Sequence, residues 1–127
     1  IESLILGKGV DDALMRAETY IEAGADAVMI HSKDRDTADL YEFLDRYAQL
    51  DRQVPIVMVP TAYNHVTDDE LAAKGAKIVI HANHLLRAAY PAMIDSAERI
   101  LKNNRSHEAD DICMPIKQIL TLIPREH

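Results

Sequence analysis

Short apolar segments alternate with amphipathic segments along the chain. The apolar segments cover about 25–30, 55–61 and 77–83, and they lack the strict alternation of a strand that faces water on one side. Strands buried on both faces are typical of parallel sheets. We therefore predict three parallel strands here, and the tail of a further strand in residues 1–5.

Apolar residues at spacings of three and four follow each predicted strand and predict helices. These helices are expected over 10–23, from about 37 to 47, 67–74, 83–102 and 115–123. Thr67 to Glu70 fits a capping box, Gly24 and Gly75 stand where glycine ends a helix, and Asn83 can cap the long helix. Residues 103–110 are polar and are expected to form a linker.

The repeated order of strand and helix is typical of βαβ units in a parallel sheet. Two architectures fit it, a doubly wound open sheet and a barrel. No Gly-x-Gly-x-x-Gly follows a strand and no Gly-Lys-Ser/Thr occurs, which disfavours the nucleotide-binding versions. A (β/α)8 barrel needs about 250 residues and eight units. This chain of 127 residues shows about four units, so we expect half of an α/β barrel.

Composition narrows the possible partners. The chain has 14 Lys and Arg against 21 Asp and Glu, and its net charge of −7 disfavours nucleic acid as a partner. Cys113 is the single cysteine, which excludes an internal disulfide and fits a cytoplasmic location. No apolar run reaches the roughly 18 residues of a membrane helix, and no signal peptide opens the chain. Because the chain starts at Ile1 inside an apparent element, we expect a preceding segment.

Four segments carry a resemblance to a known family. They are Ile1-Glu-Ser with Gly7-Lys-Gly-Val-Asp-Asp-Ala-Leu-Met-Arg-Ala-Glu-Thr-Tyr20, Ala23-Gly-Ala-Asp-Ala-Val-Met-Ile-His-Ser-Lys33, Pro55-Ile-Val-Met-Val-Pro-Thr-Ala-Tyr63 and Ile78-Val-Ile-His-Ala-Asn-His-Leu-Leu-Arg87. In this order, over about residues 1–105, they resemble the phosphoenolpyruvate mutase branch of the isocitrate lyase superfamily. The resemblance implies strands four to seven of a TIM-type barrel. Residues 1–127 would then be the C-terminal half of a single barrel domain.

The resemblance also implies an activity. The family interconverts phosphoenolpyruvate and phosphonopyruvate, an isomerisation that forms a C–P bond and serves phosphonate biosynthesis, and a close branch hydrolyses phosphonopyruvate. Both use Mg²⁺, whose ligands are expected in the missing N-terminal half and not in this chain. The family further implies a homo-oligomer, a dimer of dimers that exchanges its C-terminal helix. The expected partners are therefore a small phosphorylated substrate, the other half of the barrel and further copies of the chain.

His31 is the expected catalytic and substrate-binding residue. It follows a predicted strand, at the end where barrel enzymes build their active sites. The resemblance places the family's substrate-contacting histidine here, where a protonated ring would stabilise charge on the transferring phosphoryl group. Ser32 and Thr61, which follow two neighbouring strands, are the other expected substrate-binding residues. Lys33 is expected to be a solvated loop residue.

Glu2 and Asn83 are expected to orient the residues that contact the substrate, without contacting it themselves. Glu2 would orient the family's substrate-binding arginine, which precedes Ile1, or hold a metal-bound water. An ion pair at the barrel mouth is the alternative for Glu2, and helix capping is the alternative for Asn83. A zinc site of His31, His81 and His84 is compatible with their spacing, but nothing in the sequence demands it.

Three other functions remain open at this level. Hydrolysis of phosphonopyruvate fits the same residues. A carbon–carbon lyase fits less well. The resemblance implies that lyase members of the superfamily carry a glutamate near position 31 and Asn-x-Thr after strand six, whereas this chain has His31 and Pro60-Thr61 there. A non-catalytic half-barrel would expose two sheet edges and an apolar face, which favours pairing with another chain.

Overall fold

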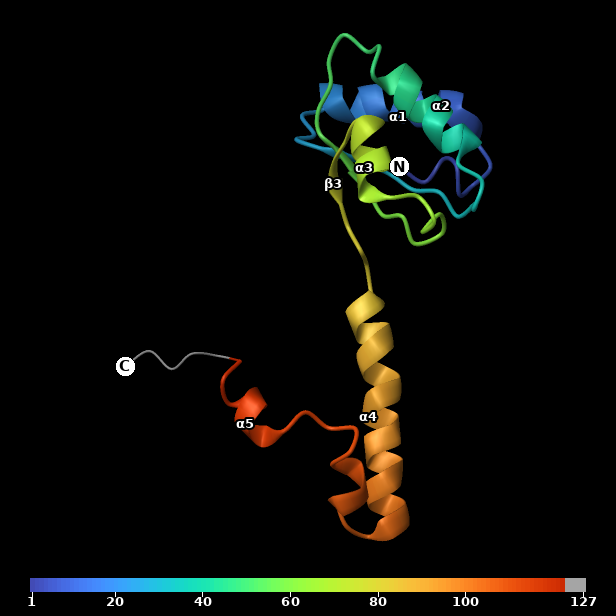
Figure 1. The fold of residues 1–127 in the computed structure, drawn as a ribbon. Coiled ribbons are helices and arrows are strands. Elements are labelled where there is room, and N and C mark those ends of the chain that lie inside the picture. Colours follow the sequence, from blue (N-terminus) through green and yellow to red (C-terminus); the bar gives the residue numbers. More distant parts are fainter. Residues whose placement is uncertain (123–127) are drawn as a thin grey trace. The chain divides into compact units, whose positions relative to one another are not determined.

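The structure is a computed structural model that describes residues 1–122. The chain divides into two compact units, Ile1–Ala82 and Asn83–His127. The first unit contains α1 (Gly9–Glu22), β1 (Val28–Ile30), α2 (Ala38–Tyr47), β2 (Ile56–Met58), α3 (Asp68–Ala73) and β3 (Ala76–Val79) (Figure 1). Each strand is followed by a helix, as the sequence predicts.

The three strands form one parallel sheet in the order β1-β2-β3. Ile30 pairs with Met58, and Met58 pairs with Val79, so the carboxyl ends of all three strands lie at the same edge of the sheet. This confirms the predicted parallel sheet, with strands shorter than the apolar runs that predict them. The hydrogen-bonded ladder ends before the apolar sequence does.

Residues 1–5 do not form the predicted strand tail, because residues 3–7 form a turn. Gly7 has a φ of 67°, which glycine adopts without strain, and this lets the chain turn directly into α1. Ile1 alone lies alongside β1: its nitrogen donates to the Met29 carbonyl at 2.6 Å and its carbonyl accepts from the His31 amide at 3.1 Å. One hydrogen bond to Met29 and one from His31, the two neighbours of Ile30, make the pattern of a parallel ladder.

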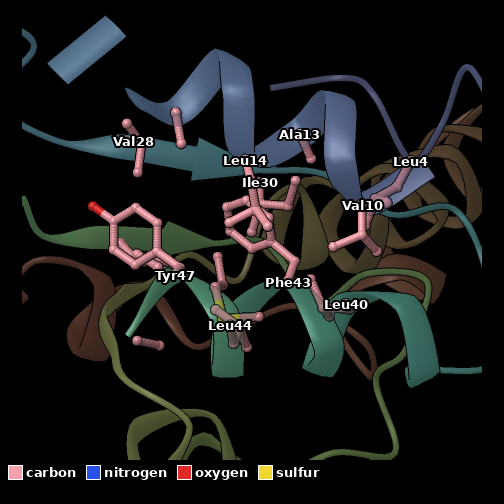
Figure 2. Close-up of a cluster of buried hydrophobic side chains, with 14 of the residues drawn as sticks. Leu4, Val10, Ala13, Leu14, Val28, Ile30, Leu40, Phe43, Leu44 and Tyr47 are labelled. Atoms are coloured by element: carbon pink, nitrogen blue, oxygen red, sulfur yellow. The ribbon is translucent and has the colours of Figure 1, made fainter. Parts of the chain in front are cut away.

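The hydrophobic core lies between one face of the sheet and the helices α1 and α2. Figure 2 shows Val28 and Ile30 of β1 converging with Leu14 of α1 and with Phe43 and Tyr47 of α2. The Phe43 and Tyr47 rings stack with their centroids 5.7 Å apart. The apolar stripes that predict these helices are the stripes that are buried: Val10, Ala13, Leu14, Ala17 and Ile21 on α1, and Leu40, Phe43, Leu44 and Tyr47 on α2.

The opposite face of the sheet, called here the open face, carries the alternate residues Met29, Val57 and Ile78, which are paired in register. These side chains do not belong to the core cluster among the described residues, and Ile78 is 50% exposed. Ile80, next on this face by alternation, is 40% exposed. The predicted burial on both faces holds for β2, whereas Met29 on this face of β1 is only half-buried within residues 1–122.

Local signals set the boundaries of the helices in the first unit. The capping box at α3 is confirmed, since the Thr67 hydroxyl accepts from the Glu70 amide at 3.2 Å and the Glu70 carboxylate accepts from the Thr67 amide at 2.7 Å. Gly24 and Gly75 follow α1 and α3 with φ values of 98° and 102°. Both positions favour glycine, as expected of a residue that ends a helix.

The second unit contains α4 (His84–Asn103), the short 3₁₀ helix η1 (His107–Ala109) within the predicted polar linker, and α5 (Ile116–Ile119). The predicted capping by Asn83 is wrong. Asn83 occupies the N-cap position, but its φ of 57° is left-handed and its side chain makes no capping hydrogen bond. Capping side chains need an extended backbone at this position.

The predicted last helix is confirmed only over Ile116–Ile119, while Ile123, Pro124 and His127 lie outside the described residues. Within residues 1–122, no helix combines the length and the apolar character needed to cross a membrane.

Candidate active site

Two predicted substrate-binding residues, His31 and Thr61, lie at the carboxyl edge of the sheet, together with His81. His31 directly follows β1, Thr61 stands three residues after β2, and His81 stands two residues after β3. Because the strands are parallel and in register, these positions share one edge. This is the edge at which barrel enzymes and open α/β sheets bind their ligands.

His31 and Glu2 form an ion-pair contact, with Nδ1 of His31 3.1 Å from Oε1 of Glu2. The His31 side chain is 35% exposed and that of Glu2 is 56% exposed, so the pair is open to solvent and to a ligand. The backbone places Glu2 here, because the Ile1 carbonyl accepts from the His31 amide. His31 is therefore a polar partner of Glu2, and the expected role of Glu2 toward an arginine or a metal-bound water stays a prediction.

The second ring nitrogen of His31 faces Met29. Nε2 lies 2.9 Å from the Met29 sulfur, two residues earlier on the same face of β1. A lone pair on Nδ1 would point toward the Glu2 carboxylate, so Nδ1 is the better place for the hydrogen of a neutral ring. A neutral His31 then carries its lone pair at Nε2, and only the protonated ring donates from both nitrogens.

Ser32 supports its own loop. Its hydroxyl accepts from the Asp34 amide at 3.2 Å, the arrangement of a turn that follows a strand. Ser32 also lines a cavity of about 240 Å³ together with Asp34, Asp36 and Asp39. Three carboxylates disfavour a phosphate in this cavity, and a substrate contact of Ser32 stays a prediction.

Thr61 lies in the turn after β2 and is exposed, and its amide donates to the Val59 carbonyl at 2.9 Å. Two residues later, Tyr63 is fully buried, and its hydroxyl has no hydrogen-bond partner of normal geometry among the described residues. Burial raises the pKa of Tyr63 to about 12, and the neighbouring Tyr41 adds to this while the Val59 backbone opposes it. Sequence reasoning missed Tyr63, because nothing in a turn sequence marks one tyrosine as buried.

The other candidates are not drawn into one cluster. His81 contacts Asp68 at the start of α3, with Nε2 3.0 Å from Oδ2. Asn83 belongs to the second unit, and its supporting role stays a prediction. Residues 1–122 contain no group of three or more His, Cys, Asp or Glu placed to hold a metal ion.

A partly buried hydrogen-bond network begins at Ser3, the residue that follows Glu2. Ser3 is 1% exposed, and its hydroxyl donates to Oδ2 of Asp12 at 2.6 Å. Nε of Arg16 donates to the same oxygen at 2.7 Å. These two bonds hold the pKa of Asp12 below its usual value. The network joins the end of the Glu2 segment to α1, and sequence reasoning did not predict it.

Comparison with known proteins identifies the family. The family model for phosphoenolpyruvate phosphomutase matches residues 1–101. The chain is 37% identical over 123 residues to a phosphonopyruvate hydrolase from Variovorax sp., covering 96% of this chain and 41% of the hydrolase. It is 36% identical over 125 residues to a phosphoenolpyruvate phosphomutase from Streptomyces hygroscopicus, covering 98% of this chain and 39% of that protein.

Solved structures agree with the sequence comparison. A phosphoenolpyruvate phosphomutase from Streptomyces platensis subsp. rosaceus matches with a TM-score of 0.83 and 42% identity, over 94% of this chain and 41% of that chain. A phosphonopyruvate hydrolase in complex with oxalate and Mg²⁺ matches with a TM-score of 0.79 and 37% identity, over 94% of this chain and 41% of the hydrolase chain. The chain spans about two fifths of the length of these relatives. It has their α/β barrel fold class, and it belongs to the phosphoenolpyruvate phosphomutase family.

Proposed function

We propose that the chain supplies one side of the active site of a phosphoenolpyruvate mutase, which interconverts phosphoenolpyruvate and phosphonopyruvate. The observation that carries the proposal is the pair of His31 and Glu2 at the carboxyl edge of a parallel sheet, in a chain that belongs to this family. A phosphoryl group is an anion, and a protonated His31 ring at this edge would stabilise its charge.

The geometry assigns each ring nitrogen a task. Nδ1 faces the Glu2 carboxylate at 3.1 Å, which fixes the orientation of the ring. Nε2 is the nitrogen left for a phosphoryl oxygen, once the Met29 sulfur has moved aside. The protonated ring then donates a charge-assisted hydrogen bond at the place where the transferring group develops charge. Thr61, at the end of the next strand, lies at the same edge and is the second substrate-binding residue in this proposal.

The residues for metal chemistry are expected elsewhere in the full-length protein. The described residues offer no donor set for Mg²⁺, so no catalytic step is assigned to a metal at these positions. The hydrolase structure that holds oxalate and Mg²⁺ supports a Mg²⁺-dependent family. We propose that Mg²⁺ binds to strands outside residues 1–122, in the N-terminal half of the same barrel domain. A cytoplasmic homo-oligomer with an exchanged C-terminal helix belongs to the same proposal.

Phosphonopyruvate hydrolysis is the second candidate function. It is favoured by the hydrolase relative, whose 37% identity matches that of the mutase relatives. Phosphorus NMR of the full-length protein with phosphonopyruvate and Mg²⁺ separates the two activities. Appearance of phosphoenolpyruvate supports the mutase, and appearance of inorganic phosphate with pyruvate supports the hydrolase. If neither forms, and His31→Ala leaves substrate binding unchanged, the site assignment is wrong.

The sharper variant is His31→Gln, which keeps a polar side chain but cannot carry a positive charge. We expect kcat/KM to fall by about 10²-fold or more, the loss typical of removing one preorganised donor to a developing charge. His65→Gln is the matched control, because His65 is exposed in the turn before α3. Equal activity of the two variants would contradict a role of His31 at the phosphoryl group.

A further inference from the structure

The Glu2 carboxylate lies on a segment that is held at both of its ends. On one side, the nitrogen and carbonyl of Ile1 bond to β1, at Met29 and His31, over 2.6 and 3.1 Å. On the other side, the buried Ser3 hydroxyl donates to Asp12 at 2.6 Å. Glu2 itself is largely exposed, so the position of its side chain depends on the backbone between these two anchors.

The second anchor is rigid for a local reason. The Ser3 carbonyl accepts from the Lys8 amide at 2.9 Å, and the Glu2 carbonyl accepts from the Leu6 amide at 3.0 Å, which closes the turn before α1. Asp12 lies in the first part of α1, and Arg16, one helical turn later, holds the same carboxylate oxygen from the other side at 2.7 Å. The carboxylate is therefore fixed by its own helix before it receives the Ser3 hydroxyl.

We propose that Asp12 is a positioning residue: through Ser3 it fixes residues 1–3 at the end of β1 and so keeps the Glu2 carboxylate against Nδ1 of His31. The inference rests on the proposed function of His31. The sequence of contacts is Arg16, Asp12, Ser3, then the Glu2 backbone and His31, and each link has a distance in the structure. The lowered pKa of Asp12 supports it, since the hydrogen bonds from Ser3 and Arg16 both favour the charged carboxylate.

The alternative to a positioning role is that Asp12 only stabilises the fold. The neighbouring Asp11 provides a control that distinguishes these two roles. Asp11 is the adjacent acid on α1 and also contacts an arginine, with Oδ1 2.7 Å from Arg46 on α2. It has the same charge and nearly the same position relative to the helix start. Asp11→Asn therefore controls for the loss of a carboxylate at this end of α1 and for the loss of an arginine contact.

The test uses the full-length protein with Asp12→Asn, Ser3→Ala and the control Asp11→Asn, each checked for folding by thermal melting. We expect Asp12→Asn and Ser3→Ala to lower kcat/KM about tenfold, short of the roughly hundredfold loss that misplacement by 1 Å can cause. Asp11→Asn should change it less than twofold. In a Glu2→Gln background, Asp12→Asn should have almost no further effect, because residues that act through one another are not additive.

Nitrogen NMR of His31 provides a readout that does not depend on turnover. In the parent protein the neutral ring should carry its hydrogen on Nδ1, and Asp12→Asn and Ser3→Ala should shift the population toward Nε2. An unchanged tautomer population, or equal effects of Asp12→Asn with and without Glu2, would overturn the inference. If Glu2→Gln and His31→Gln leave activity intact while the tautomer still responds to Asp12, the proposed function fails and the positioning network stands.

Discussion

His31 has a partner at each ring nitrogen, and the two partners differ in strength. Glu2 offers a full charge at 3.1 Å, while Met29 offers a polarisable sulfur at 2.9 Å. Met29 is an uncharged and flexible side chain, and both His31 and Glu2 are partly open to solvent. In the proposed function, we therefore expect a phosphoryl oxygen to displace Met29 from Nε2 while Glu2 stays at Nδ1.

Tyr63 is the residue whose ionisation should affect stability at alkaline pH. Its folded pKa of about 12 lies above the ordinary value of 10.0, so it contributes stability fully below pH 10 and loses it as pH rises through about 12. We expect Tyr63→Phe to be no less stable at neutral pH, because its hydroxyl makes no bond of normal geometry among the described residues. The variant should also lose less stability between these two pH values.

Denaturant unfolding at neutral and alkaline pH measures this effect. Tyr90→Phe is the matched control, since Tyr90 is 61% exposed on α4. A clear loss of stability for Tyr63→Phe at neutral pH would show that the buried hydroxyl has a bonding partner in the full-length protein.

At the scale of single residues, the sequence predicted positions better than partners. His31 was predicted at a strand end because an apolar run stops there. Its contact with Glu2 could not be predicted, because residues 2 and 31 meet only through the register of Ile1 against β1. The burial of Ser3 and Tyr63 was missed for the same reason, since burial depends on which elements pack over them.

At the scale of elements, two threonines at helix starts behave differently. Thr67 caps α3 through its hydroxyl, while Thr37 stands at the N-cap of α2 without a capping side-chain bond. At α2, Asp36 accepts from the Ala38 amide at 3.0 Å instead. We expect Thr67→Ala to cost about 1 kcal/mol of unfolding free energy, typical of a lost N-cap, and Thr37→Ala to cost much less.

Chemical denaturation of both variants, with hydrogen exchange across α3, checks this prediction. Faster exchange confined to α3 in Thr67→Ala would place the loss at the capping box. An equal loss of unfolding free energy in Thr67→Ala and Thr37→Ala would contradict the assignment of the capping role to Thr67 alone.

Helices were predicted more accurately than strands, for a physical reason. The buried apolar residues of a helix recur along its whole length, so the pattern marks where the helix begins and ends. The helices α1 and α2 therefore lie close to their predicted positions. An apolar run in a strand indicates which residues are buried, but it does not indicate where the hydrogen bonds to the next strand begin and end. The ladders of β1 and β2 therefore cover only three residues each within longer apolar runs. The positive φ of Asn83 belongs to the junction between the two units, and no residue pattern within α4 signals it.

At the scale of the whole molecule, the open face of the sheet leads us to expect that the three strands of this chain do not form a stable monomer alone. In a barrel, alternate strand residues point inward and pack in layers with side chains from the other strands. Met29, Val57 and Ile78 occupy such inward positions, and Ile78 and Ile80 are substantially exposed among the described residues. An exposed apolar face of this kind favours association.

We therefore expect residues 1–127, produced alone, to self-associate through this face. Light scattering after size-exclusion chromatography should give a mass above 14.3 kDa. Ile78→Thr with Ile80→Thr should reduce association, because threonine keeps the β-branched shape suited to a strand while lowering the apolar area. Leu6→Thr, at a 65% exposed turn position away from the sheet strands, should leave association unchanged.

The same experiment separates a barrel fragment from an independent module. A barrel fragment should no longer associate through the open face when the remaining strands of the full-length protein are present, since those strands cover this face. A cooperatively melting 14.3 kDa monomer of residues 1–127 would contradict this view. It would mean that the exposed Ile78 and Ile80 are tolerated at the surface, and that the sheet with its α1 and α2 layer is sufficient as a folded unit.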